Sequence, residues 1–190
     1  MDKSQFHLCL NEITNCKLQI ELSMHFNSIE ELEHMERVIK ECTLCNVGMV
    51  DDEGVPYVIP MNFGYEEGVI YLHSAQEGRS ITILEKNPLV CITFSTFTAL
   101  SWQHEEVACS YRLQGESVIC YGRVLFEEDH EEKVRALNRI MHHYTGREFT
   151  YSDPAVKNVK VWKVAIEEAS IREFGKPSKN ALRFRSSRPM

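Results

Sequence analysis

The chain has 190 residues, a formal net charge of −7 and a sequence pI of about 5.6, with 43% hydrophobic and 26% charged residues. The acidic balance argues against a protein that binds nucleic acid or anionic membranes, and no apolar run reaches the ~18 residues that a transmembrane helix needs. This length and composition are typical of one soluble globular domain with an appended end.

The N-terminal end and the cysteines indicate a compartment. The first residues, MDKSQFHLCLNEITNC, lack a continuous apolar core and a small-residue cleavage site, so no signal peptide is predicted. The seven cysteines have irregular spacings and several fall within apparent strands. This pattern is typical of reduced thiols rather than a disulfide framework, and we expect a cytoplasmic protein.

The first predicted elements are a helix and a strand. Residues 1–27 have weak periodicity and are predicted to be an N-terminal extension of the main domain, residues 28–175. An arm over a neighbouring subunit is an alternative, and Met35 could also serve as a start. Ser28 and Glu31 form a capping-box pattern ahead of an apolar helical stripe, which predicts a helix over residues 29–42. A strand over residues 45–50 follows, and an acidic turn leads out of it.

The stretch over residues 56–80 is the most informative part of the chain. Residues 57–64 alternate with the period of a pleated strand, and the turn Glu66-Glu67-Gly68 leads into a second strand over residues 69–73. Gly78-Arg79-Ser80 then stands at a predicted helix N-terminus. Backbone N–H groups with a guanidinium beside them suit a phosphate group.

The second half of the chain contributes further strands and one long helix. A short helix ends before Pro88, and strands are predicted over residues 89–96 and 117–126, the second with a bulge near Gly122. Residues 97–112 are interpreted as a long loop with strand pieces. A helix capped by Asp129 is expected to end at Gly146, and the last strand covers residues 159–166.

The order of these elements favours one fold class. About six strands with two or three helices, and no alternation of strands and helices, predict a mainly β protein with appended helices rather than a Rossmann-type sheet. The expected architecture is an antiparallel β-barrel. Residues 176–190 form a basic tail that is expected to be solvated or disordered.

Five segments, in their order and spacing, resemble the FMN-binding split-barrel superfamily of pyridoxamine 5'-phosphate oxidase-like proteins, and within it the nitroimidazole-resistance-type branch. The segments are PYVIPMNFGY, IYLHSAQEGR, VCITFS, ESVICYGRV and VKVWKVAIE. The resemblance covers roughly residues 35–175. It implies a six-stranded antiparallel split β-barrel that forms a homodimer, with one FMN in each of two grooves at the subunit interface.

The resemblance also implies roles for individual residues. The strand beside the isoalloxazine, which would offer backbone hydrogen bonds to the ring edge, consists of Val58, Ile59, Pro60, Met61, Asn62 and Phe63. His73, Ser74 and Ala75 would flank the ribityl chain and phosphate, with His73 as the candidate catalytic residue. Arg79 would pair with the phosphate.

Ser80 and Ser117 complete the implied site. The hydroxyl of Ser80, which stands where the family often has lysine, could donate to the phosphate, and Ser117 would contact the flavin from a neighbouring strand. Gly115-Glu116 stands where the branch usually has Tyr-Arg. Both departures lower the positive charge expected near the phosphate.

Other chemistry-bearing residues have structural interpretations. Cys42 and Cys45 form one CxxC without the context of a zinc or thioredoxin site, so core thiols are favoured, as they are for Cys91, Cys109 and Cys120. His142 and His143 point in different directions on a helix, and no metal site is predicted. Trp162 is interpreted as core, with a lid over the flavin as the alternative.

The resulting hypothesis is an FMN-binding oxidoreductase that passes electrons from a reduced donor, such as a nicotinamide, to a small planar acceptor. The sequence contains no hydrolase, Walker, dinucleotide-binding or zinc-protease motif. One alternative is a non-catalytic flavin- or haem-binding module, with His73 or His104 as the axial ligand. Another is a structural or regulatory dimer without a cofactor.

Overall fold

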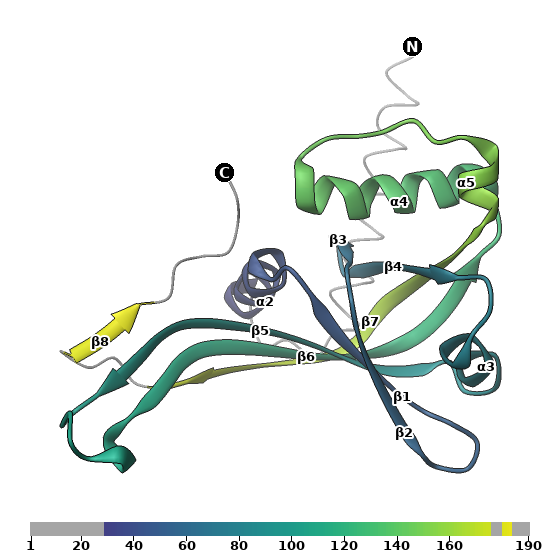
Figure 1. Ribbon diagram of the computed structural model, residues 1–190. Coiled ribbons are helices and arrows are strands. Elements are labelled where there is room, and N and C mark those ends of the chain that lie inside the picture. Colours follow the sequence, from purple (N-terminus) through teal and green to yellow (C-terminus); the bar gives the residue numbers. More distant parts are fainter. Residues whose placement is uncertain (1–28, 176–179, 184–190) are drawn as a thin grey trace.

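A computed structural model describes residues 29–175 and 180–183, which form a mainly β fold with helices at its periphery (Figure 1). The helices are α2 (Ile29–Glu41), α3 (Arg79–Lys86), α4 (His130–Thr145) and α5 (Asp153–Lys157), with a short 3-10 helix at Ala108–Ser110. The strands are β1 (Cys45–Val50), β2 (Pro56–Met61), β3 (Gly64–Glu66), β4 (Val69–Ala75), β5 (Leu89–Trp102), β6 (Arg112–Glu127), β7 (Val159–Phe174) and β8 (Asn180–Arg183).

The strands form one antiparallel sheet in the order β2-β1-β5-β6-β7-β4-β3, with β8 paired to β5. Its end strands β2 and β3 follow one another along the chain and are joined only by residues 62 and 63. The two ends of the sheet are therefore brought to one corner, which is consistent with a split barrel. The long strands β5, β6 and β7 extend beyond this body as an arm on the left of Figure 1, where β8 lies.

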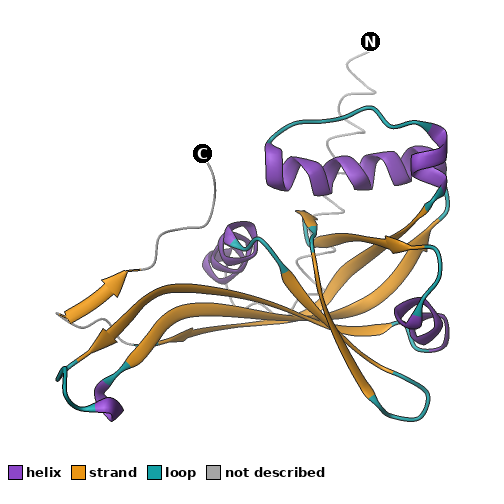
Figure 2. Ribbon diagram, viewed as in Figure 1, coloured by secondary structure: helices purple, strands orange, loops and turns teal. Residues whose placement is uncertain are grey.

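The helices cover different parts of the sheet (Figure 2). In this view α2, α4 and α5 lie above the strands, whereas α3 lies at the right beside the β1–β2 hairpin. The predicted apolar stripe of α2 is confirmed, because Met35 and Ile39 are fully buried. They belong to the main core, which is centred on Phe63, Phe94 and Trp162.

A second, smaller cluster joins α4 and α5 to the outer side of β4 and β7. It consists of Ala136, Leu137, Val156 and Val161, with Tyr71 and Tyr151 packed against it. The segments of β4 and β7 around Tyr71, His73 and Val161 are therefore covered on both faces. This burial matters for His73, which lies on β4.

Several turn and cap predictions are confirmed. The β3–β4 turn has positive φ at both Glu67 (45°) and Gly68 (80°), the geometry of a tight hairpin. The Asp129 carboxylate accepts a hydrogen bond from the backbone N–H of Glu132, and α4 ends at Gly146 in the left-handed region. The predicted bulge is present as a register shift between Tyr121 and Gly122.

Three predicted strand boundaries differ from those in the structure. The predicted strand over residues 57–64 is divided into β2 and β3, because the backbone N–H of Phe63 donates to the hydroxyl of Tyr144 on α4, at 3.1 Å, rather than continuing a ladder. The interpretation of residues 97–112 as a long loop with strand pieces was wrong in its extent, since β5 continues to Trp102 and β6 begins at Arg112, which leaves a loop only over residues 103–111. The last strand continues to Phe174.

These differences change the strand count. The six-strand prediction is not confirmed, because the divided strand and β8 bring the sheet to eight strands. Four residues of the predicted basic tail form β8, so the expectation of a tail without structure was wrong there. The rest of the tail, the extension over residues 1–27 and Ser28 lie outside the described residues.

Candidate functional site

Strand β2 offers a free backbone edge. In the described part of the chain it pairs only with β1, with registers from Cys45–Met61 to Val50–Pro56. The side chains of Val58, Pro60 and Asn62 are exposed, whereas Ile59 and Met61 pack toward the main core. A strand edge of this kind carries N–H and C=O groups that can bind a flat polar ligand edge.

Helix α3 begins with an open N-terminus, as predicted. No described side chain caps it, and Gly78 precedes it with φ 142°, a conformation that favours glycine. Apart from its chain neighbours, no described residue has an atom within 4 Å of where a Cβ on Gly78 would stand. The first-turn backbone N–H groups are thus accessible to an anion.

Arg79 is the first residue of α3, and the β1–β2 hairpin positions its guanidinium. The guanidinium carbon lies 4.6 Å from the centre of the Tyr57 ring, and Nη2 lies 3.7 Å from Oδ2 of Asp51. The side chain remains 54% exposed. Stacking and a loose ion pair therefore restrain Arg79 while leaving donors for a ligand; sequence analysis did not identify either partner.

Residues 73–75 do not all face one direction. The Ser74 hydroxyl accepts from the indole N–H of Trp162 at 3.2 Å and donates to the carbonyl of Ala75 at 2.8 Å. Trp162 is fully buried, so its core interpretation is confirmed and the lid interpretation was wrong. Ala75 is exposed at the end of β4, close in sequence to the start of α3.

His73 lies on the opposite face of β4 from Ser74, because adjacent strand residues alternate. It is paired with Val161, which belongs to the cluster under α4 and α5. Its Nδ1 is buried and has no hydrogen-bond partner among the described residues. This burial lowers the pKa of His73 below its ordinary value of 6.5, which favours a neutral imidazole.

The buried His73 should make folding stability fall in mild acid. Because its pKa is lower in the folded state than in the unfolded chain, the unfolded state binds a proton first as the pH drops below 6.5. Above that pH the imidazole of His73 is neutral in both states, so it makes no pH-dependent contribution to the free energy of unfolding. Urea unfolding between about pH 7.5 and pH 5 should show a smaller loss of stability for His73→Gln than for the original protein.

An equal loss of unfolding free energy in the original protein and in His73→Gln as the pH falls would contradict the burial of a neutral His73. Glu116 does not interfere, because its pKa is lowered from 4.5 by hydrogen bonds from Arg37 and His34, and its contribution is lost only below that window.

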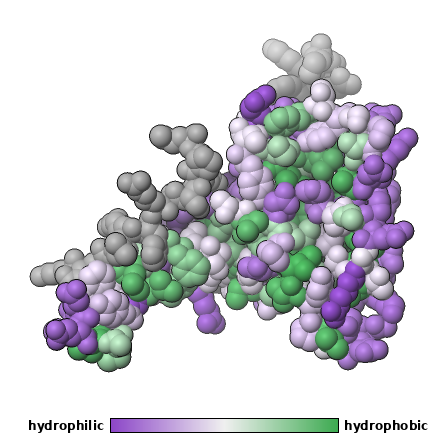
Figure 3. Space-filling model, viewed as in Figure 1, coloured by the Kyte–Doolittle hydropathy of each residue, from purple (hydrophilic) through white to green (hydrophobic). Residues whose placement is uncertain are grey.

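The outer face of β1, β2, β5 and β6 is apolar and is not covered by any described helix or strand. Cross-strand pairs place Val58 beside Gly48, Gly48 beside Cys91, and Cys91 beside Tyr121. Val50, Val58, Leu89 and Tyr121 on these strands are between 41% and 61% exposed. Figure 3 shows apolar side chains at the surface over the middle of the molecule, where β1 and β2 cross the long strands. Such a patch marks a binding or association surface.

Ser117 belongs to this outer face and Glu116 to the other. Ser117 pairs with Ser95 on β5, and it is separated by strand alternation from the fully buried Val118. The Glu116 carboxylate instead accepts two hydrogen bonds from Arg37 on α2, at 2.7 and 3.0 Å. The negative charge that replaces the expected arginine is thus paired on the face away from Ser117.

A groove of about 600 Å³ lies between α2, the β3–β4 hairpin and α4. Four of its charged groups are paired with one another: Lys40 with Glu36 at 2.7 Å, and Arg139 with Glu66 at 2.6 Å. The Tyr65 hydroxyl donates to Glu36 at 3.1 Å. These contacts hold the helices to the hairpin, and Glu67 also lines the groove.

The thiol predictions are mostly confirmed. Cys42, Cys45 and Cys120 are buried, and burial raises the pKa of Cys45 and of Cys120 to about 12, so neither is a nucleophile at neutral pH. Cys91 is partly buried, but Cys109 is exposed in the 3-10 helix, so its interpretation as a core thiol was wrong.

Two further histidines, His143 and His104, and the acidic pair Glu127 and Glu128 lie in different parts of the fold. His143 is within 2.8 Å of the carbonyl of Cys42, a structural contact, and His104 is exposed in the loop at the end of the β5–β6 hairpin. Glu127 and Glu128 pair with Lys163 and Lys160 rather than standing alone in solvent.

The sequence model of a protein family described as pyridoxamine 5'-phosphate oxidase matches residues 31–173. The chain belongs to this family. The matched range contains β1 to β7, the open N-terminus of α3 and both Arg79 and Ser117. No curated protein matches the chain significantly.

Three solved structures are similar to this chain, one of them at high sequence identity. A candidate 5-nitroimidazole antibiotic resistance protein from Bacteroides thetaiotaomicron is 48% identical, with a TM-score of 0.69, over 78% of this chain and 86% of that one. A flavocytochrome from Azotobacter vinelandii is 22% identical, with a TM-score of 0.68, over 80% and 77% of the two chains. A protein of Mycobacterium smegmatis that binds FAD and haem is 14% identical, with a TM-score of 0.69, over 84% and 83%.

The described part of the chain contains no helix that is both long and apolar enough to cross a bilayer.

Proposed function

We propose that the chain is an FMN-binding oxidoreductase that passes electrons from a reduced donor through the flavin to a small acceptor. The observation that carries the proposal is the combination of the free edge of β2 with the open N-terminus of α3 and the half-exposed guanidinium of Arg79. Family membership and the 48% identity to a candidate nitroimidazole resistance protein support it.

The donor set fits a phosphorylated, flat, three-ring ligand. Arg79 and the first-turn N–H groups of α3 would bind the phosphate, with Ser80 as a further donor. The edge of β2 over residues 58–63 would bind the polar rim of the ring system through its backbone. Ser117 on the outer face would approach the ring from β6.

We extend the proposal to a homodimer with the cofactor at the subunit interface. The uncovered apolar face of β1, β2, β5 and β6 supports it, because a monomer rarely leaves so many large apolar residues of one sheet face in water. A second copy would cover this face and exclude water from the ring system. It would leave one side of the ring accessible to a planar acceptor, such as a nitroaromatic.

The flavin would supply hydride and electron transfer when bound, and the protein would supply position and electrostatics. Arg79 would hold the phosphate, and the backbone of β2 would fix the orientation of the ring. His73 is the sequence-based candidate for proton transfer, but it lies on the face of β4 that α4 and α5 cover, the same placement that argues against it as a haem ligand.

The residue positions fit haem less well than flavin. Of the two candidate axial ligands, His73 lies on a covered face and His104 lies at the hairpin end of the β5–β6 arm. Neither imidazole lies on the outer face with Val58 and Tyr121. The visible absorption spectrum of the purified protein distinguishes bound haem from bound flavin.

The test is the visible absorption spectrum of the purified protein, before and after incubation with FMN and removal of unbound cofactor. We expect the two absorption bands of oxidised flavin, and their bleaching by NADH or NADPH without oxygen. Light scattering should give the mass of a dimer. A Soret band of haem, or a protein that stays colourless after incubation with FMN, would contradict the proposal.

A further inference from the structure

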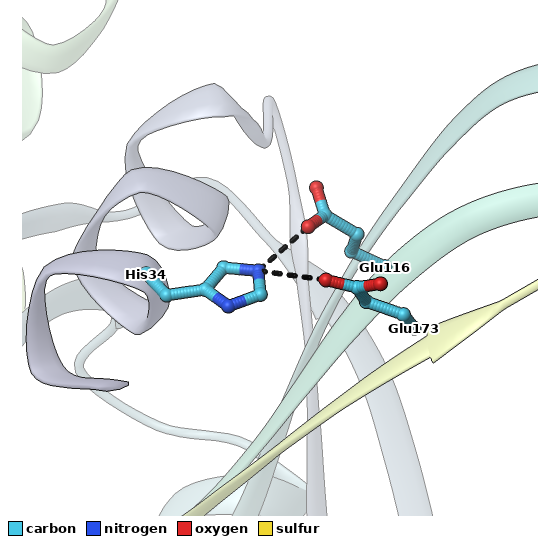
Figure 4. A group of neighbouring side chains, drawn as sticks. All are labelled: His34, Glu116 and Glu173. Carbon is cyan, nitrogen blue, oxygen red and sulfur yellow. Dashed lines mark hydrogen bonds and ion pairs between the residues drawn. The ribbon is translucent and has the colours of Figure 1, made fainter. Parts of the chain in front are cut away.

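A cluster of three potential metal ligands lies where α2 crosses the long strands, on the face opposite Ser117. His34 comes from α2, Glu116 from β6 and Glu173 from β7, and Figure 4 shows their side chains converging on one point. Nε2 of His34 lies 2.6 Å from Oε1 of Glu116 and 3.9 Å from Oε1 of Glu173. All three ligand atoms lie within 4.8 Å of one another.

These separations fit a shared cation. Ligand atoms bound at ~2 Å to a tetrahedral ion stand about 3 Å apart. The two measured distances from Nε2 lie on either side of that value, so small side-chain rotations would bring the atoms into place. The Glu173 side chain is 74% exposed and free to rotate, whereas His34 (27%) and Glu116 (18%) are held in position.

The charge around the cluster also favours a cation. Glu116, Glu173 and the nearby Glu41 carry three negative charges when ionised, and Arg37 supplies one positive charge between Glu116 and Glu41. With His34 neutral, two negative charges remain uncompensated within the group. A divalent ion would balance them.

Arg37 is compatible with an ion at this position. Its Nη1 donates to Oε2 of Glu116 at 3.0 Å, and its Nη2 donates at 2.7 Å to Oε1, the oxygen that also faces His34. A metal on Oε1 would replace the Nη2 contact, whereas the Nη1 contact would persist. It would then act as the outer hydrogen bond that orients a ligating carboxylate.

We infer that His34, Glu116 and Glu173 form a binding site for a divalent transition-metal ion. One imidazole and two carboxylates suit Zn²⁺ or a similar ion, whereas Ca²⁺ and Mg²⁺ prefer oxygen ligands alone. Water would complete the coordination. The ion would replace the hydrogen bond between Nε2 of His34 and Oε1 of Glu116 and would tie α2 to β6 and β7.

The experiment titrates Zn²⁺ into the full-length protein after chelator treatment, with a chromogenic chelator as competitor. Both His34→Gln and Glu173→Gln should weaken binding of one equivalent of Zn²⁺ at least about tenfold. His130→Gln is the matched control, because His130 also faces a carboxylate, that of Asp153 at 3.5 Å, but on α4. Its binding curve should be unchanged.

Co²⁺ in place of Zn²⁺ identifies the ligand type. The expected visible bands are those of nitrogen and oxygen ligands, without the charge-transfer band of a thiolate, and they should be lost in Glu173→Gln. Because Glu173 is exposed, that variant should fold even if His34→Gln does not, which circular dichroism would verify. Equal Zn²⁺ binding by the original protein and Glu173→Gln, or a thiolate band, would overturn the inference.

Discussion

Replacing Arg79 with alanine is expected to weaken FMN binding by about 10- to 100-fold, because a hydrogen bond to a charged group contributes about 1.5–3 kcal/mol. Riboflavin, which lacks the phosphate, should bind the original protein and Arg79→Ala almost equally. The measurement is a fluorescence titration with each flavin. The ratio of the two affinities therefore isolates the phosphate contact.

The structure offers a matched control for this experiment. Arg135 on α4 is similarly exposed (58%) and pairs with Glu131 and Glu132, far in sequence from α3. Arg135→Ala should bind both flavins like the original protein. Unchanged FMN affinity in Arg79→Ala would remove Arg79 from the phosphate site, and an equal loss for FMN and riboflavin would indicate a disturbed fold instead.

The local features of the site could be predicted from the sequence. The Gly68 hairpin, the start of α3 after Gly78 and the Asp129 cap each depend on a few neighbouring residues, and each was confirmed. The same local rules place Arg79 at a helix N-terminus. They do not reach Tyr57 and Asp51, because those contacts join residues more than twenty positions apart.

Contacts between residues far apart in the chain explain what could not be predicted from the sequence. Glu116 is a negative charge where the resemblance led us to expect arginine, and its partner Arg37 lies 79 residues earlier in the chain. Residues 97–112 were interpreted as a long loop with strand pieces, because exposed apolar residues such as Phe97 and Val107 interrupt the alternation of apolar and polar residues. Strands β5 and β6 are held by backbone pairing with one another, with β7 and with β8.

Gly64→Ala should cause a large loss of stability, although Gly64 has no functional role in the proposed site. A Cβ at this position would stand 2.6 Å from the backbone carbonyl carbon of Arg139 and 2.7 Å from the backbone nitrogen of Ile140. Because both atoms belong to the backbone of α4, no side-chain rotation relieves the overlap. The helix would have to move away from β3.

Moving α4 would disturb more than one contact. The Tyr144 hydroxyl, on the same helix, accepts from the backbone of Phe63 at the corner between β2 and β3 and donates to Thr43. We therefore expect Gly64→Ala to lower the free energy of unfolding by about 2–3 kcal/mol, in the upper range of overpacking substitutions. Urea unfolding of the cofactor-free protein measures it without a contribution from ligand binding.

Gly48→Ala separates this close approach from the general effect of adding a methyl group to a strand. Gly48 lies on β1, and a Cβ there would meet the nearest atom, the carbonyl oxygen of Cys91, at 3.3 Å, where a shift of a few tenths of an ångström suffices. Its cost should stay below about 1 kcal/mol. Similar losses for the two variants would show that α4 adjusts easily, and that the contact between β3 and α4 does not hold the β2–β3 corner in place.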